Sequence, residues 1–105
     1  MASMVWKVTG EVIEWRGPAP YYFLPMSEDD SAELKIEAAG LEYWGQVGVV
    51  VKIGRTSFVT AVFPKDGLYL VPLRANVRAA EKLEVGLPTT AAVRLNHQRG
   101  VRRGR

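Results

Sequence analysis

The 105-residue sequence contains no cysteine and only one histidine, His97. A chain without cysteine forms no disulfide, offers no thiolate nucleophile and binds no zinc through sulfur. With one histidine in the chain, a pair of histidines for catalysis or metal binding is excluded. We expect His97 to be a surface residue. These absences predict that the protein uses no metal and no cofactor.

Long apolar runs are missing as well. No stretch approaches the roughly 20 apolar residues that a membrane-spanning helix needs. The N-terminus lacks the basic leader and apolar segment that are typical of a secretory signal. We therefore expect a cytoplasmic protein without a membrane segment. Hydrophobic residues make up 48% of the chain, which is enough for one packed domain of this length.

The basic charge is concentrated at the C-terminus. The formal net charge is +3, but four of the 14 basic residues belong to segment 98–105, so segment 1–97 has 10 basic and 11 acidic residues. The sequence thus predicts one near-neutral domain over residues 1–97 and a basic, disordered tail over residues 98–105. Such a tail could contact nucleic acid in a salt-dependent and sequence-independent way. Its arginines are Arg99, Arg102, Arg103 and Arg105.

Alternation of apolar and polar residues predicts three successive antiparallel strands in the middle of the chain. They cover residues 46–53, 56–63 and 68–73. Gly54 suits the first position of a two-residue type II′ turn between the first two, and Asp66-Gly67 suits a second turn. Pro72 has no N–H to donate, so it should lie at a strand end or a sheet edge.

The flanking segments add three strands. In the first, over residues 4–15, the apolar face switches after Val12, which predicts a bulge or bend that Gly10 would ease. A short strand over residues 21–24 stops at Pro25, and the last strand covers residues 89–96.

Two short helices lie between these strands. Ser27 is the expected N-cap of the first, and acidic residues follow it in the first turn, where they favour the positive end of the helix dipole. The second is expected over residues 74–83. The apolar stripes are Leu34, Ala38 and Leu41 in the first helix and Val77, Ala80 and Leu83 in the second.

The order of these elements occurs twice. Each half contains a strand, a short strand that ends in proline, a helix and another strand. One such half would leave sheet edges open, whereas two interleaved halves can close a barrel. We therefore predict a mainly β fold, in which a duplicated ββαβ motif forms a six-stranded double-split β-barrel capped by two short helices. Since both halves lie in one chain, we expect a monomer.

Three motifs in fixed order resemble the family called "domain of unknown function nineteen-oh-five". They are E-W-x-G-P-A-P-x-x-F-L-P, G-x-V-x-V-x-V-x-I-G-x-T-x-F-x-T-x-x-F-P and G-x-Y-L-V-P-L-R-x-x-V-R-x-A-E-x-L-x-V-G, and the resemblance as a whole spans roughly Trp6 to Leu95. The resemblance implies a double-split β-barrel related in shape to the AbrB/MazE/MraZ fold. Some members are fused to YdeI/OmpD-associated domains. The family has no established activity, so the resemblance implies a fold and no mechanism.

The strongest candidate site is a basic stripe on the second predicted helix. Arg74, Arg78 and Lys82 recur every four residues and therefore share one face. Two arginines one turn apart can bind a phosphate or carboxylate, and the helix N-terminus adds partial positive charge. The competing interpretation is a solvent-facing stripe paired with nearby glutamates, which is the commoner case for charged helix faces.

Aromatic residues gather near the ends of the predicted strands. They could line a pocket or stack on bases, or they could fill the small core. We single out Trp15 and Tyr22 as candidate ligand contacts. The whole group is Trp15, Tyr21, Tyr22, Phe23, Tyr43 and Trp44.

Three functions are compatible with these patterns. The first is a non-enzymatic module that binds a small anionic ligand or a protein partner. The second is a nucleic-acid-binding protein that uses its arginine-rich tail and its AbrB-like shape. The third is an enzyme, which we place last because the sequence has no phosphate-binding glycine loop, no metal-ligand spacing and no serine in a nucleophile elbow.

Overall fold

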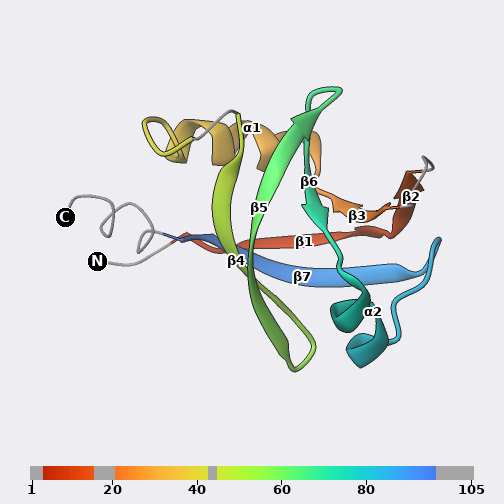
Figure 1. Cartoon of the computed structure of the whole chain (residues 1–105). Helices are drawn as coiled ribbons and strands as arrows, with labels where there is room; N and C mark the ends of the chain where they lie inside the picture. Colours follow the sequence, from red (N-terminus) through yellow and green to blue (C-terminus); the bar gives the residue numbers. More distant parts are fainter. Residues whose placement is uncertain (1–3, 16–20, 43–44, 97–105) are drawn as a thin grey trace.

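One strongly curled antiparallel sheet and two short helices make up the fold (Figure 1). The computed structural model describes residues 4–15, 21–42 and 45–96. The strands are β1 (Trp6–Glu11), β2 (Ile13–Trp15), β3 (Tyr21–Pro25), β4 (Val47–Ile53), β5 (Thr56–Lys65), β6 (Leu68–Pro72) and β7 (Pro88–Leu95), and the helices are α1 (Glu28–Glu37) and α2 (Ala75–Glu81). The order in the sheet is β1-β7-β4-β5-β6-β3-β2. The predicted mainly β, barrel-like fold with two helices is thus confirmed.

The number of strands differs from the prediction. We expected six, and the described chain has seven because the predicted strand over residues 4–15 is interrupted at Val12. β1 pairs with β7 and β2 pairs with β3, so the two pieces lie at opposite ends of the strand order. Val12 is buried, and its carbonyl accepts a hydrogen bond of 2.8 Å from the Gly86 amide. At the predicted switch of the apolar face after Val12, the strand is therefore broken into β1 and β2, and the segment that follows α2 stabilises this break by its hydrogen bond to Val12.

Both predicted turns are confirmed. Ile53 pairs with Thr56, which leaves Gly54 and Arg55 as a two-residue turn with a φ of +58° at Gly54. In the second turn Asp66 and Gly67 both have positive φ, as a type I′ turn requires.

β5 continues two residues beyond its predicted end. It pairs with β4 up to Val62 and with β6 from Phe63 to Lys65, so Pro64 lies where the strand changes partners. A proline is tolerated at such a position because one of its edges no longer belongs to a regular ladder.

The first helix begins as predicted, the second begins one residue later than predicted, and both end earlier. The Ser27 side chain accepts a hydrogen bond of 3.1 Å from the Asp30 amide, which confirms the N-cap. Because α1 ends at Glu37, Leu41 lies beyond the helix and is exposed, whereas Leu34 and Ala38 are fully buried as expected.

The second helix is shorter than predicted as well. α2 ends at Glu81, and Lys82 follows it with a left-handed φ of 55°. Val77 and Leu83 are buried, but Ala80 is exposed, so the expected apolar stripe is wrong at Ala80. In the described chain no helix is both long and apolar enough for a membrane crossing.

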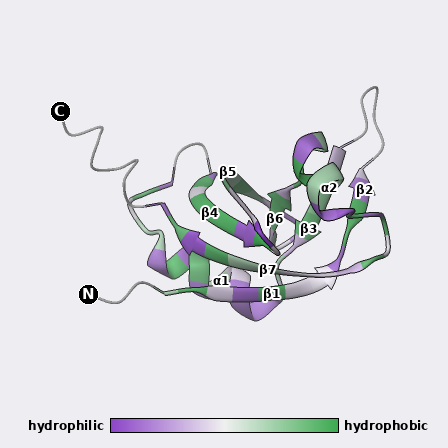
Figure 2. Cartoon of the chain, turned by 90° about the horizontal axis from the view of Figure 1, so that it is seen from below, coloured by the Kyte–Doolittle hydropathy of each residue, from purple (hydrophilic) through white to green (hydrophobic). Residues whose placement is uncertain are grey.

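Backbone hydrogen bonds join the two halves of the chain reciprocally. The Met26 amide donates to the Tyr69 carbonyl at 2.9 Å, and the Leu73 amide donates to the Tyr22 carbonyl at 2.8 Å. β3 and β6 pair between these bonds. The two helices then leave toward opposite ends of the sheet (Figures 1 and 2), and each shows alternating hydrophobic and hydrophilic residues in Figure 2.

Tyr69 provides a test of this packing. Burial raises the pKa of the Tyr69 hydroxyl above its usual value of 10.0, and the Glu42 carboxylate raises it further. The folded state therefore holds this proton more tightly than the unfolded state. The contribution of the protonated Tyr69 hydroxyl to the free energy of unfolding is present below pH 10. It is lost as the pH rises through the pKa that Tyr69 has in the folded protein. In an absorbance titration at 295 nm we expect one of the four tyrosines to ionise late, and Tyr69→Phe to remove that late step. Titration of all tyrosines together in the native protein would contradict this expectation.

Candidate ligand-binding pocket

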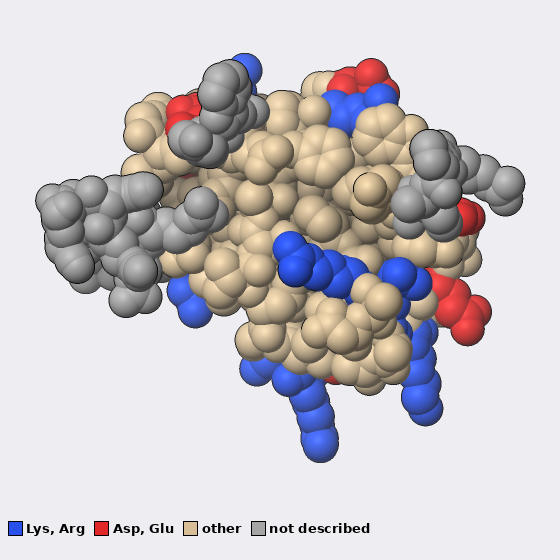
Figure 3. Space-filling view, in the orientation of Figure 1, with Lys and Arg blue, Asp and Glu red and all other residues tan. Residues whose placement is uncertain are grey.

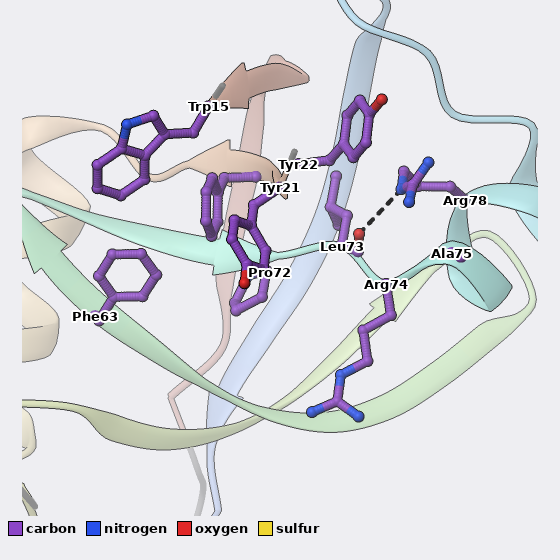
Figure 4. Close-up of a pocket in the computed structure, with 10 residues that line it drawn as sticks. Trp15, Tyr21, Tyr22, Phe63, Pro72, Leu73, Arg74, Ala75 and Arg78 are labelled. Atoms are coloured by element: carbon purple, nitrogen blue, oxygen red, sulfur yellow. Dashed lines mark hydrogen bonds between the residues drawn. The ribbon is translucent and has the colours of Figure 1, made fainter. Parts of the chain in front are cut away.

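A pocket of about 580 Å³ lies between the β2–β3 hairpin, the end of β6 and α2 (Figure 4). Its lining is mainly apolar, with aromatic rings at one end and arginines at the other. Pockets of 300 to 1,000 Å³ with this kind of lining are typical of small-molecule sites.

The aromatic end is built around Phe23, which is buried on β3. Trp15 and Tyr21 are cross-strand partners, and their rings lie 6.0 and 6.4 Å from the Phe23 ring. Phe63 of β5 meets Phe23 edge-on at 5.2 Å. The alternation of a strand places Tyr21 and Phe23 on the same face. The outer two rings remain accessible, since Trp15 is 44% exposed and Tyr21 is 60% exposed.

The other end is defined by Arg78 on α2. Its guanidinium carbon lies 3.8 Å from the centre of the Tyr22 ring, and its Nε donates a hydrogen bond of 3.1 Å to the Leu73 carbonyl. The Tyr22 hydroxyl in turn donates a long bond of 3.4 Å to Glu14. These contacts hold the guanidinium plane in one orientation. Within the described residues, neither Nη group of Arg78 has a hydrogen-bond or ion-pair partner.

Arg74 is a second cation at this end. It occupies the N-cap position of α2, but its side chain makes no capping hydrogen bond and is exposed. Figure 4 shows the Arg74 and Arg78 side chains leaving the start of α2 in different directions, and both line the pocket. The face drawn in Figure 3 carries basic side chains across its middle and at its lower edge, whereas the acidic side chains of the described residues are found only toward its rim.

Four of the five predicted ligand contacts line this pocket: Trp15, Tyr22, Arg74 and Arg78. Lys82 does not, because α2 ends before it and the left-handed backbone of Lys82 takes it off the helical stripe. Phe63 also lines the pocket but was not among the residues predicted from the sequence. In the sequence, Phe63 is marked only by its position at the end of an apolar strand. It reaches the pocket because β5 pairs with β6 at this point.

Other candidates from the sequence lie outside the described residues. These are His97, Tyr43, Trp44 and the arginines Arg99, Arg102, Arg103 and Arg105. In the part of the chain that the structure describes, no three acidic or histidine side chains gather in a way that could hold a metal ion.

The two helices pack on the sheet in different ways. Each follows a strand that ends in proline, and Ser31 and Arg78 both lie four residues after their N-cap. The small Ser31 side chain is buried and accepts a 2.9 Å hydrogen bond from the Tyr69 amide, so α1 lies directly on β6. Arg78 is too large for such a contact and lies over the Tyr22 ring instead. The pocket lies on the α2 side of the sheet, and Arg78 is one of its lining residues.

Fold and site together define a small barrel-like antiparallel domain with a pocket of ligand size. The chain belongs to the family described as Domain of unknown function (DUF1905), whose model matches residues 9–95. That range contains every residue that lines the pocket. No curated protein and no solved structure matches the chain.

Proposed function

We propose that this protein is a non-enzymatic binding module whose ligand is a small molecule with an anionic group, held in the pocket next to α2. The observation that carries this proposal is the position of Arg78. Its guanidinium is oriented by Tyr22 and Leu73, yet both of its Nη groups are left for a ligand among the described residues. An oriented guanidinium loses little conformational freedom when it binds a carboxylate or phosphate.

Electrostatics favour an anion over a neutral or cationic ligand. Arg74 and Arg78 both line the pocket, and in the described chain neither forms an ion pair. The apolar lining displaces water and strengthens the attraction between these cations and a bound anion. Charge-assisted hydrogen bonds to arginine are shorter and stronger than neutral ones.

The exposed aromatic rings support a ligand site rather than a packing role alone. A small domain needs large buried side chains, and Phe23 is the buried member of this aromatic group. Trp15 and Tyr21 are about half exposed and border the same pocket. Rings that are held by neighbours but open on one side are suited to contact a ligand.

We also infer that the two halves of the fold are copies of one ββαβ motif and close a double-split barrel. β1 and β2 stand at the two ends of the strand order but are separated by only Val12 in the chain. β3 pairs with β6 and β4 with β7, so each half supplies strands to the other. A monomer that is complete in one chain follows from this arrangement.

The other functions stay predictions. Nucleic-acid binding through Arg99, Arg102, Arg103 and Arg105 concerns residues outside the described part of the chain. An enzymatic role and a cytoplasmic location likewise stay hypotheses, and no contact described above favours an enzyme over a binding module.

The proposal is tested by NMR titration of the isotope-labelled protein with benzoate, phenyl phosphate and methanesulfonate. We expect shifts confined to residues around Arg78, Tyr22 and Trp15. We also expect Arg78→Ala to weaken binding by about tenfold or more, because a hydrogen-bonded charge pair is lost. Arg94→Ala is the matched control, since Arg94 is exposed on β7 and does not line the pocket. Equal weakening by both substitutions would indicate non-specific attraction, and spectra that do not respond would favour a protein partner instead.

A further inference from the structure

We infer that the ligand is a small aromatic carboxylic acid, bound with its ring at the Trp15 end of the pocket and its carboxylate at Arg78. This inference rests on the proposed function and specifies the chemistry of the ligand. It follows from the separation of two kinds of side chain along one cavity. Trp15, Tyr21 and Phe63 lie toward one end and the two arginines of α2 lie toward the other (Figure 4).

The aromatic end offers a place for one more ring. Phe23 already has three aromatic neighbours, at 5.2 to 6.4 Å from its ring centre. Trp15 and Tyr21 keep much of their surface exposed, and both line the pocket. Aromatic rings at such distances attract each other in tilted or edge-on arrangements beyond what buried area provides. A planar aromatic ring on the ligand therefore gains more binding free energy here than an alkyl chain of equal size.

The cationic end fits a carboxylate. Arg78 uses Nε for the Leu73 carbonyl, so the remaining donors are the paired N–H groups on its two Nη atoms. Two parallel N–H donors match the two oxygens of a carboxylate in a bidentate contact. Because the Tyr22 ring covers one face of the guanidinium, the ligand approaches in the guanidinium plane.

A single negative charge fits this end better than two. Glu14 lies 3.4 Å from the Tyr22 hydroxyl, and the Tyr22 ring lies under Arg78. Arg74, Arg78 and Glu14 together carry one net positive charge, which a monoanion neutralises. A second charge on the ligand would exceed the net positive charge of this group, and the Glu14 carboxylate, which lies beside the Tyr22 hydroxyl but does not line the pocket, would oppose it. Lys65 lies 4.4 Å over the Trp15 ring but also within 3.9 Å of Asp66, so its charge is partly balanced.

Isothermal titration calorimetry at pH 8 with four probes tests this inference. The probes are 2-naphthoate, the neutral 2-naphthylmethanol, acetate and the dianionic 2-naphthyl phosphate. We expect 2-naphthoate to bind at least about tenfold tighter than the alcohol, since a charge-assisted bidentate contact is worth that much. It should also bind at least about tenfold tighter than acetate because of the ring. The phosphate should bind no tighter than 2-naphthoate.

Variants separate the two ends. Arg78→Ala should remove the preference for 2-naphthoate over the alcohol, and Trp15→Ala should reduce the preference over acetate. Arg78→Lys keeps the charge but loses the planar fork, so it should fall between Arg78→Ala and the native protein. Arg94→Ala should leave all four affinities unchanged. Circular dichroism of each variant establishes that it is folded.

The outcomes distinguish this inference from the proposal on which it rests. If acetate or the alcohol binds as tightly as 2-naphthoate, or the phosphate binds tighter, the assignment of the ligand as an aromatic monocarboxylate is overturned. Anion binding at Arg78 remains supported in that case by any anionic probe that shifts the resonances of Arg78 in the NMR titration. If no anionic probe binds in the pocket, both the inference and the proposed function are overturned.

Discussion

Replacing Leu24 by alanine is expected to lower the free energy of unfolding by about 3–4 kcal/mol. Leu24 is fully buried in β3, where it pairs with the equally buried Val71 of β6. Its Cδ1 also lies close to Gly10, where β1 crosses this pair. The Leu24 side chain therefore packs against two other strands, β1 and β6, one from each half of the chain, and the cavity left by its removal cannot collapse easily. A domain with a total stability of about 5–15 kcal/mol would lose much of it.

Urea denaturation followed by fluorescence measures this effect. Leu24→Met nearly conserves the volume and should cost less than about 1.5 kcal/mol. Ile36→Ala removes a similar number of atoms from an exposed position on α1 and should change stability by less than about 0.5 kcal/mol. A loss below about 1 kcal/mol for Leu24→Ala would show that β3 and β6 are not packed as described.

Gly54→Ala is expected to destabilise the protein by about 2–4 kcal/mol through two separate effects. Gly54 has a φ of +58° in the β4–β5 turn, where a side chain is strained. An added Cβ would also lie 2.8 Å from Cδ of Glu81, the last residue of α2. That carboxylate accepts hydrogen bonds from the Arg55 amide at 3.2 Å and the Thr56 hydroxyl at 2.6 Å. The methyl group would push Glu81 away and weaken the link between α2 and the hairpin.

Gly67 provides the matched control for this substitution. It has a φ of +83° in the β5–β6 turn, but an added Cβ would meet nothing within 4 Å. Gly67→Ala therefore carries the backbone strain alone and should cost less than Gly54→Ala. In a double-mutant cycle, Glu81→Ala should remove the extra cost of Gly54→Ala. Equal costs at Gly54 and Gly67, or additive effects in the cycle, would show that the contact with Glu81 contributes nothing.

The functional proposal connects with this packing at α2. The same short helix holds Glu81 against the β4–β5 turn and Arg78 over Tyr22. Loss of the Glu81 contact would loosen the helix that presents the guanidinium. Gly54→Ala is therefore a poor variant for binding studies, whereas Arg78→Lys alters the pocket without touching this link.

The approximate positions of most strands, both turns and the region where each helix begins followed from the sequence alone. These features depend on local patterns: alternation of valines in β4, glycine at positions of positive φ, and a serine hydroxyl at the first turn of α1. Arg74 and Arg78 were identified in the same way, from a spacing of four residues. Such signals lie within a few neighbours along the chain and need no knowledge of what packs against them.

Only the tertiary structure decided that the first strand breaks at Val12, that Lys82 leaves the stripe, and that Phe63 borders the pocket. The partner of Val12 is the segment after α2, more than 70 residues away, and Phe63 meets Phe23 only because β3 and β5 both flank β6. Pairing between distant strands depends on how the whole sheet curls, and no local pattern encodes it. For the same physical reason, the sequence named an aromatic group and a basic group separately, and the fold placed them at two ends of one pocket.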